Sequence, residues 1–143
     1  GVTVGIGTDG AASNNDLDPF DELRDAAMAG KLGAADASAV AAPDVVRAAT
    51  EGGAELLGFD SGRIEEGALA DLAVVDFEKP HLTPDHDPIS HLAYAVRGSD
   101  VEHTVVGGEV LVRNRDVRTL DEAAVRREAQ AHAEALVGRA EGN

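Results

Sequence analysis

Branched apolar residues alternate with smaller ones at the start of the chain. The branched residues are Val2, Val4 and Ile6. Because a strand points successive side chains to opposite faces, this alternation predicts a strand over residues 2–6 with one branched apolar face. The parity of the small-residue face continues to Asp9, which we therefore expect at the end of the strand.

A polar turn follows and leads into helical segments. Asp18 is a favourable N-cap and Pro19 suits the first helical position, so we expect a helix that runs to Gly30. A second helix is predicted over residues 43–49, and a pair of glycines separates it from a short helix over residues 54–57. The strand, the turn and the first helix form half of a βαβ unit.

The second half of the chain predicts strands and one long helix. A strand is expected over residues 72–77 and a helix over residues 89–95. Two valine-rich strands, over 101–106 and 110–112, flank a two-glycine turn, which is typical of a β-hairpin. The last helix is capped by Asp121, and one of its faces carries Val125, Ala129, His132 and Leu136.

The change of pattern near Gly62 divides this α/β chain. We expect residues 1–61 to supply βα material, residues 62–118 to form part of a small β-domain with an inserted helix and loop, and residues 119–143 to form a C-terminal helix. A sheet of about three strands is marginal by itself, and the chain begins within a strand pattern without an initiator Met. We therefore expect a C-terminal piece of a longer protein.

The chain is strongly acidic. Among 143 residues, 27 are Asp or Glu and 12 are Lys or Arg, which gives a formal net charge of −15. Such a field repels nucleic acid and anionic membranes, so we expect neither as a partner. Abundant Asp beside scarce Lys suggests adaptation to high salt; the alternative is the alanine-rich composition of a high-GC genome. With 3% aromatic residues, Ala, Val and Leu must do most of the packing.

Missing residue types exclude some chemistry. The absence of cysteine excludes disulfides and Cys-ligated zinc. No apolar run approaches the ~20 residues that a membrane-spanning helix needs. We expect a cytoplasmic protein.

The strongest candidate for chemistry is Asp9, at the carboxyl end of the predicted strand, where α/β enzymes place catalytic groups. A carboxylate there can bind a divalent metal or accept a proton from bound water. Ser13 and its neighbours line the following loop with polar groups. From the spacing alone, the favoured interpretation is an Asp that caps its own turn.

Three histidines lie close together in a proline-rich stretch, at His81, His86 and His91. Their five-residue spacings do not match the i, i+4 pair of helical metal ligands. With neighbouring Asp residues a metal cluster is conceivable, but hydrogen bonds to loop carbonyls and helix capping are favoured.

Two stretches resemble the amidohydrolase superfamily. The segment from Gly7 to Asn15, GTDGAASNN, followed by Leu17 and Asp18, resembles the eighth barrel strand of its cytosine deaminase and chlorohydrolase branch. The segment 62–76, GRIEEGALADLAVVD, resembles the re-entry of that superfamily into its small β-domain. The shorter segment ATEGGA at 49–54 resembles the helix that precedes this re-entry in the superfamily. The segments KPHLTP at 79–84 and SHLAYA at 90–95 are similar to 5-methylthioadenosine/S-adenosylhomocysteine deaminases.

The resemblance implies the last βα units of a metal-dependent TIM barrel joined to part of a small β-sandwich-like domain. It implies a divalent metal, usually zinc, with Asp9 as a metal ligand that also shuttles the proton of the attacking water. Water would attack C6 of an adenine ring and release ammonia. Ser13 would contact the substrate or hold the loop. The substrate would be a small molecule, and the full-length parent an enzyme that is a candidate homo-oligomer.

Much of the family's machinery has no counterpart in these residues, including its HxH pair, its later histidines and seven barrel strands. We therefore expect the isolated chain to be inactive. A chlorohydrolase or a guanine or cytosine deaminase of the same branch is an alternative identity for the parent. A different class of alternative is a non-catalytic acidic module that binds a partner through its strand edges.

Overall fold

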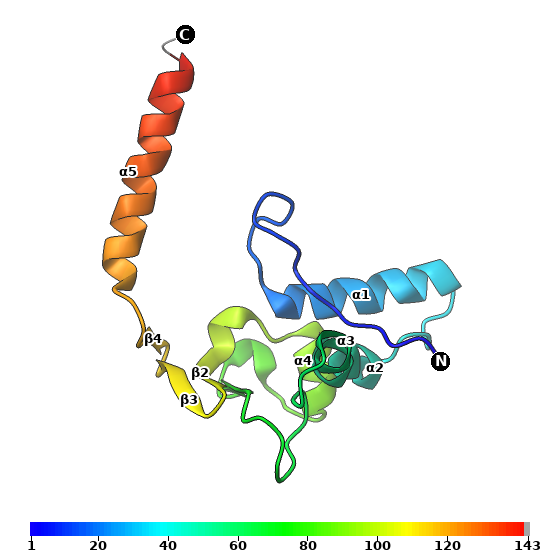
Figure 1. The fold of residues 1–143 in the computed structure, drawn as a ribbon. Coiled ribbons are helices and arrows are strands. Elements are labelled where there is room, and N and C mark those ends of the chain that lie inside the picture. The colour runs from blue at the N-terminus through cyan, green and yellow to red at the C-terminus, as the bar shows by residue number, and fades with distance from the viewer. Residues whose placement is uncertain (142–143) are drawn as a thin grey trace.

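The computed structural model describes residues 1–141 (Figure 1). In this range the helices are α1 (Pro19–Ala34), α2 (Ala42–Arg47), α3 (Gly53–Leu57), α4 (Pro88–Tyr94) and α5 (Glu122–Glu141), with a π-helical turn η1 (Ala48–Gly52) and 3-10 turns η2 (Pro80–Leu82) and η3 (Gly98–Asp100). The strands are β1 (Leu72–Val75), β2 (Val101–Val106), β3 (Glu109–Arg113) and β4 (Asp116–Val117). The last two residues of the expected C-terminal helix, 142–143, lie outside the described residues.

Helix α1 begins where the sequence predicts and ends later. The Asp18 carboxylate accepts a hydrogen bond from the Phe20 amide at 3.0 Å and caps the helix. The helix continues through Gly30 to Ala34 and is capped by Ala35, whose φ of 50° is left-handed. Gly30 allows Val40 to pack closely against the helix, since an added Cβ would lie 2.5 Å from a methyl group of Val40. The prediction that Gly30 ends the helix is therefore wrong.

The predicted break at the glycine pair is also wrong. Helix α2 passes through η1 into α3, and Gly52 and Gly53 both have right-handed helical backbone angles. A Cβ on Gly52 would lie only 2.1 Å from the carbonyl oxygen of Val4. The glycine therefore admits the N-terminal segment against the helix.

The predicted strand over residues 2–6 is not formed. This segment is irregular, Val2 is 90% exposed and Val4 is 59% exposed. Contact with the helices comes partly from the other face, where the Thr3 hydroxyl donates to the Glu55 carboxylate at 3.1 Å. Within residues 1–141 no strand pairs with this segment. A strand needs a neighbour for its amides and carbonyls, which explains the irregular backbone.

The core lies among α1, α2 and α4 and is built from small aliphatic side chains. Its buried members are Leu23, Ala27, Ala42, Val45 and Ala93. Ile6 packs against this cluster and ties the N-terminal segment to it. The expectation that Ala, Val and Leu do most of the packing is confirmed.

The strands form one antiparallel sheet in the order β1-β2-β3-β4. The predicted hairpin is confirmed, and its turn residues Gly107 and Gly108 have φ values of 56° and 85°. Positive φ at both positions is the geometry of a type I′ turn. The Asp71 carboxylate accepts from the Gly107 amide at 2.7 Å, which fastens the turn to the approach of β1. Strand β1 ends two residues earlier than predicted, and β4 was not predicted.

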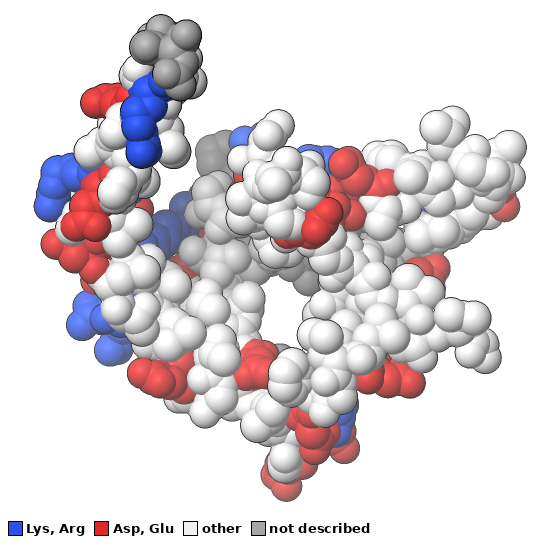
Figure 2. Space-filling view, turned by 45° about the horizontal axis from the view of Figure 1, so that its top comes forward, with Lys and Arg blue, Asp and Glu red and all other residues white. Residues whose placement is uncertain are grey.

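Helix α5 stands away from the rest of the described chain (Figure 1). The predicted apolar face is uncovered in this structure, with Val125 50% and Leu136 60% exposed. Figure 2 shows acidic side chains scattered over the visible face and basic ones gathered along the side that carries α5. Six arginines belong to the last part of the chain: Arg113, Arg115, Arg118, Arg126, Arg127 and Arg139. None of the helices in residues 1–141 combines the length and apolarity needed to cross a membrane.

Candidate active-site loop

Asp9 lies in the exposed loop between the N-terminal segment and α1. Its φ is 57°, in the left-handed region that few residues other than glycine adopt, although Asp tolerates it better than most. The following turn is closed by the amides of Ser13 and Asn14, which donate to the Gly10 carbonyl at 2.9 and 3.0 Å. The loop therefore presents Asp9 to solvent from a folded turn.

Ser13 is directed at Asp9. Its hydroxyl lies 2.7 Å from Oδ2 of Asp9 and 3.1 Å from the Gly10 carbonyl oxygen. The hydrogen bond from Ser13, followed by one from the Gly10 amide, holds the pKa of Asp9 below its ordinary value. These hydrogen bonds favour the ionised form of the carboxylate, which is the form that binds a metal or accepts a proton.

Asn14 joins this loop to α1. Its Nδ2 group donates to the Thr8 carbonyl at 2.9 Å and to the Glu22 carboxylate at 2.5 Å. Its Oδ1 atom accepts from the amides of Asp16 and Leu17 at 3.3 and 3.4 Å. This role of Asn14 was not predictable from the sequence, because nothing in the local pattern pairs residue 14 with residue 22.

The three neighbouring histidines do not form a metal site. No group of three or more metal-ligating side chains is found within residues 1–141. His91 donates to the Asp87 carbonyl at 3.0 Å, as the favoured interpretation expected, and its ring meets Phe77 edge-on. The cap of α4 is the Asp87 carboxylate, which accepts from the amides of Ile89 and Ser90, and no histidine takes part in it.

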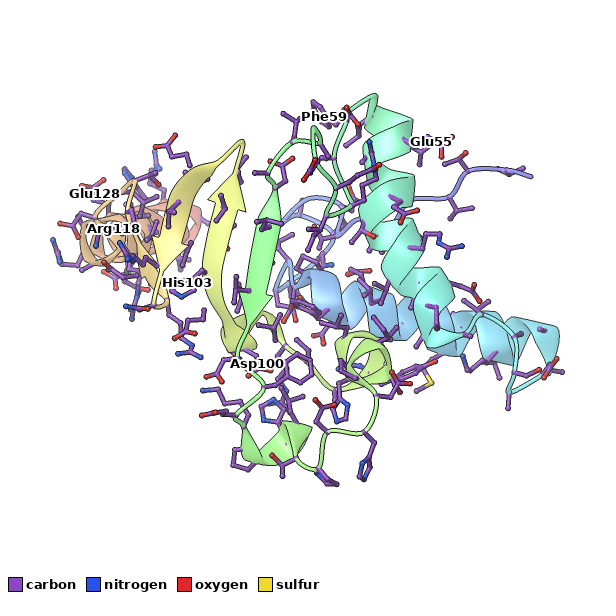
Figure 3. All side chains as sticks on the ribbon, turned by 90° about the horizontal axis from the view of Figure 1, so that it is seen from below. Glu55, Phe59, Asp100, His103, Arg118 and Glu128 are labelled. Atoms are coloured by element: carbon purple, nitrogen blue, oxygen red, sulfur yellow. The ribbon has the colours of Figure 1, made fainter. Side chains whose placement is uncertain are left out.

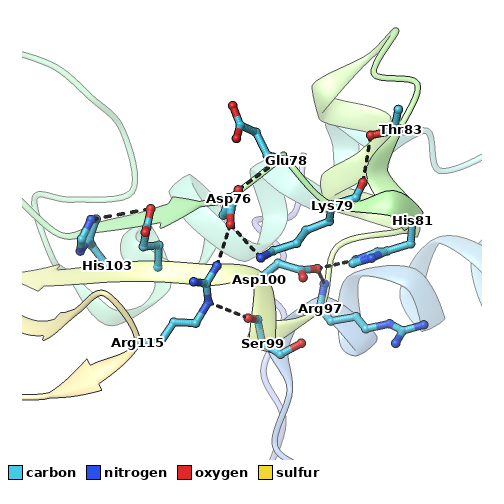
Figure 4. Close-up of polar contacts among 11 residues, drawn as sticks. Asp76, Glu78, Lys79, His81, Thr83, Arg97, Ser99, Asp100, His103 and Arg115 are labelled. Carbon is cyan, nitrogen blue, oxygen red and sulfur yellow. Dashed lines mark hydrogen bonds and ion pairs between the residues drawn. The ribbon is translucent and has the colours of Figure 1, made fainter.

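His81 makes a contact that sequence reasoning missed. Its Nε2 lies 2.9 Å from Oδ2 of Asp100, a carboxylate that is only 3% exposed (Figure 4). Burial opposes ionisation of Asp100, but hydrogen bonds from His81 and the Arg97 amide outweigh it and keep the pKa of Asp100 below its ordinary value. Figure 3 shows Asp100 where the sheet meets the segment that carries η2 and α4. The pair therefore joins η2 to the end of η3, directly before β2.

A second ionic cluster lies beside it. Oδ2 of Asp76 is 2.8 Å from the Lys79 ammonium and 2.8 Å from the Arg115 guanidinium (Figure 4). Lys79 first, then Arg115 and the Glu78 amide, lower the pKa of Asp76 from 3.8 to about 2. The cluster joins the end of β1 to the turn before β4.

Comparison with known proteins shows the family of the chain. A family model described as the amidohydrolase family matches residues 1–111. The chain belongs to the amidohydrolase family. The chain is 76% identical over 143 residues to a protein of Natronomonas pharaonis named 5-methylthioadenosine/S-adenosylhomocysteine deaminase. It is 71% identical over 140 residues to a protein of the same name from Haloarcula marismortui.

The chain spans about a third of the length of these relatives. The first match covers 100% of this chain and 33% of the relative, and the second covers 98% and 32%. The chain therefore corresponds to about one third of each longer relative, as its sequence predicts.

Solved structures agree with the assignment. An adenosine deaminase from Xanthomonas campestris with bound zinc matches with a TM-score of 0.92 and 40% identity, over 96% of this chain and 32% of that one. The zinc complex of atrazine chlorohydrolase from Arthrobacter aurescens TC1 matches with a TM-score of 0.77 and 32% identity, over 91% and 29%. The predicted fold class, an α/β chain with the end of an amidohydrolase barrel and part of a small β-domain, is confirmed, and the sheet of the small domain is antiparallel.

Proposed function

We propose that the full-length protein deaminates an adenine-containing nucleoside such as 5-methylthioadenosine or S-adenosylhomocysteine, using a divalent metal. The observation that carries this proposal is 76% identity, over all 143 residues, to a protein named for that activity. An adenosine deaminase with bound zinc as a structural neighbour at a TM-score of 0.92 supports the same reaction type.

Asp9 is the residue of this chain that we assign to the reaction. Its carboxylate is exposed and ionised, and Ser13 fixes one of its oxygens at 2.7 Å. In the proposed mechanism Asp9 accepts a proton from the attacking water while that water adds to C6 of the adenine ring. The proton then leaves with the departing ammonia. Ser13 orients the carboxylate, and its contact with substrate stays a prediction.

Asp9 fits the role of one ligand of a divalent metal. A carboxylate oxygen is a common zinc ligand, and the exposed Asp9 carboxylate meets that requirement. Such a metal, when bound, lowers the pKa of its water to about 7 and so supplies the nucleophile. Because catalytic zinc takes about three protein ligands and residues 1–141 contain no metal-ligating cluster, the other ligands must lie elsewhere in the full-length protein.

Hydrolytic dechlorination is the second candidate within the family. Its support is the match to atrazine chlorohydrolase at 32% identity. That identity is well below the 76% and 71% to the two named deaminases, so we rank it second.

The experiment that tests the proposal is Asp9→Asn in the full-length protein, assayed as ammonia release from 5-methylthioadenosine. The variant keeps the size of the side chain and loses the charge and the proton acceptor. We expect kcat to fall at least ~10²-fold, the low end for a general base, with the fold intact. Asp16→Asn, an exposed change in the same loop, is the control and should leave kcat nearly unchanged. Near-normal turnover by Asp9→Asn would make Asp9 a turn cap.

Three broader expectations belong to the same proposal. Adaptation to high salt is supported by the net charge of −15 and is in keeping with the sources of the two relatives. A cytoplasmic location and a homo-oligomeric parent are further parts of it. Fractionation of cells and light scattering of the full-length protein would test these two.

A further inference from the structure

Asp9 has a left-handed backbone conformation, and the hydrogen bonds to its carboxylate come from its own loop. Few residues other than glycine adopt this conformation, so contacts from neighbouring residues must keep Asp9 there. The Ser13 contact fixes the carboxylate relative to the same small loop only. Something else must fix that loop relative to the helices.

The Asn14 amide group reaches the peptide unit directly before Asp9. That unit contains the Thr8 carbonyl, which accepts from Asn14 Nδ2 at 2.9 Å. The plane of this unit determines φ of Asp9, so the hydrogen bond restrains the conformation from which the Asp9 side chain projects. The same Nδ2 group donates to Glu22 Oε1 at 2.5 Å, and Glu22 lies in the first turns of α1.

The polar groups of Asn14 match this place in one orientation only. Its nitrogen faces two acceptors, Thr8 O and Glu22 Oε1, and its oxygen faces the amides of Asp16 and Leu17. An Asp here would turn an acceptor toward the Glu22 carboxylate. An Ala would leave the Thr8 carbonyl and the half-buried Glu22 carboxylate without this donor.

We propose that Asn14 and Glu22 are positioning residues that hold the Asp9 carboxylate in its productive direction. This rests on the proposed function, in which Asp9 binds the metal and accepts the proton. Neither residue touches the reacting atoms; each acts through the peptide unit before Asp9. Small displacements of such a group lower the rate strongly, since misplacement by about 1 Å can cost ~10²-fold.

The test is a double-mutant cycle in the full-length protein, with kcat for 5-methylthioadenosine and zinc affinity by chelator competition as readouts. We expect Asn14→Ala to lower kcat at least ~10-fold and to weaken zinc binding, with less than ~2-fold further effect on either in the Asp9→Asn background. Additive losses in the two backgrounds, or an unchanged Asn14→Ala protein, would overturn the proposal.

Glu22 supplies a second variant in case Asn14→Ala does not fold. Glu22→Ala should reproduce the losses, whereas Glu22→Gln keeps an oxygen acceptor and should stay within ~3-fold of wild type. Asp25→Ala, an exposed change on the same helix, is the matched control. Equal losses in Glu22→Gln and Glu22→Ala would contradict the acceptor role.

The readouts separate this proposal from the proposed function. If the wild-type protein releases no ammonia but zinc affinity shows the coupling between Asn14 and Asp9, the substrate assignment is wrong and the positioning role stands. If Asp9→Asn abolishes deamination and Asn14→Ala does not lower it, the positioning role alone is wrong.

Discussion

The Asp18 carboxylate joins two segments that lie 80 positions apart in the sequence. Its Oδ2 atom accepts from the backbone amide of Gly98 at 2.7 Å, while Oδ1 accepts from the Phe20 amide at 3.0 Å. The same side chain thus caps α1 and binds the start of η3, directly before the sheet. Because α1 also carries Glu22, this contact relates the Asp9 loop to the small sheet.

Replacing Asp18 should therefore destabilise the protein more than the loss of an ordinary cap. Asp18→Ala removes a cap worth about 1 kcal/mol and leaves the half-buried Gly98 amide without its acceptor, which adds roughly 1–3 kcal/mol. We expect a lower midpoint of urea unfolding in the full-length protein. Asp121→Ala, which removes the cap of exposed helix α5 alone, is the matched control and should cost less. Equal costs would show that the Gly98 contact contributes nothing.

The 143-residue chain by itself should bind zinc weakly and deaminate nothing. It offers Asp9 as a ligand where catalytic zinc takes about three. Isothermal titration with zinc and an ammonia assay on 5-methylthioadenosine measure both properties. Ammonia release above a blank, from the chain without the rest of the protein, would contradict this expectation.

Salt should stabilise the chain. With a net charge of −15, screening relieves the repulsion among carboxylates, so the melting temperature should rise from low salt to molar KCl. Circular dichroism across a KCl series measures this. A melting temperature that is flat or falls over that range would remove the support for salt adaptation.

Asp76 should give stability that disappears in acid. Its pKa is lowered from 3.8 to about 2 in the folded protein, so the folded state favours the ionised form. This contribution is fully present above about pH 4 and is lost as pH falls toward 2. Asp76→Asn should therefore melt below wild type at neutral pH, and the difference should shrink between pH 4 and pH 2. A difference that stays constant over that interval would show that Lys79 and Arg115 do not stabilise the ionised form.

Features coded by neighbouring residues were predictable from the sequence. The cap at Asp18, the two-glycine hairpin turn and the cap at Asp121 each depend on residues within a few positions, and all three are present. The loop at Asp9 was likewise located by its position after an alternating segment and by its resemblance to a family motif.

Features that depend on distant partners were not predictable. The strand over residues 2–6 needs a neighbouring strand, and none is found in residues 1–141. The contacts of Asn14 with Glu22 and of His81 with Asp100 pair residues that no periodicity relates. The glycine pair at 52–53 predicted a helix break, but the helix continues through it. Gly52 instead makes room for the backbone of Val4, a contact that local propensity does not encode.

That last contact limits how the protein can change by mutation. Every single-base missense change of a glycine codon introduces a Cβ atom, and at Gly52 this atom would lie 2.1 Å from the carbonyl oxygen of Val4. No single-base missense change at position 52 therefore avoids this clash. Any substitution there displaces the segment that leads to Asp9, so a position in the helices constrains the loop that precedes α1.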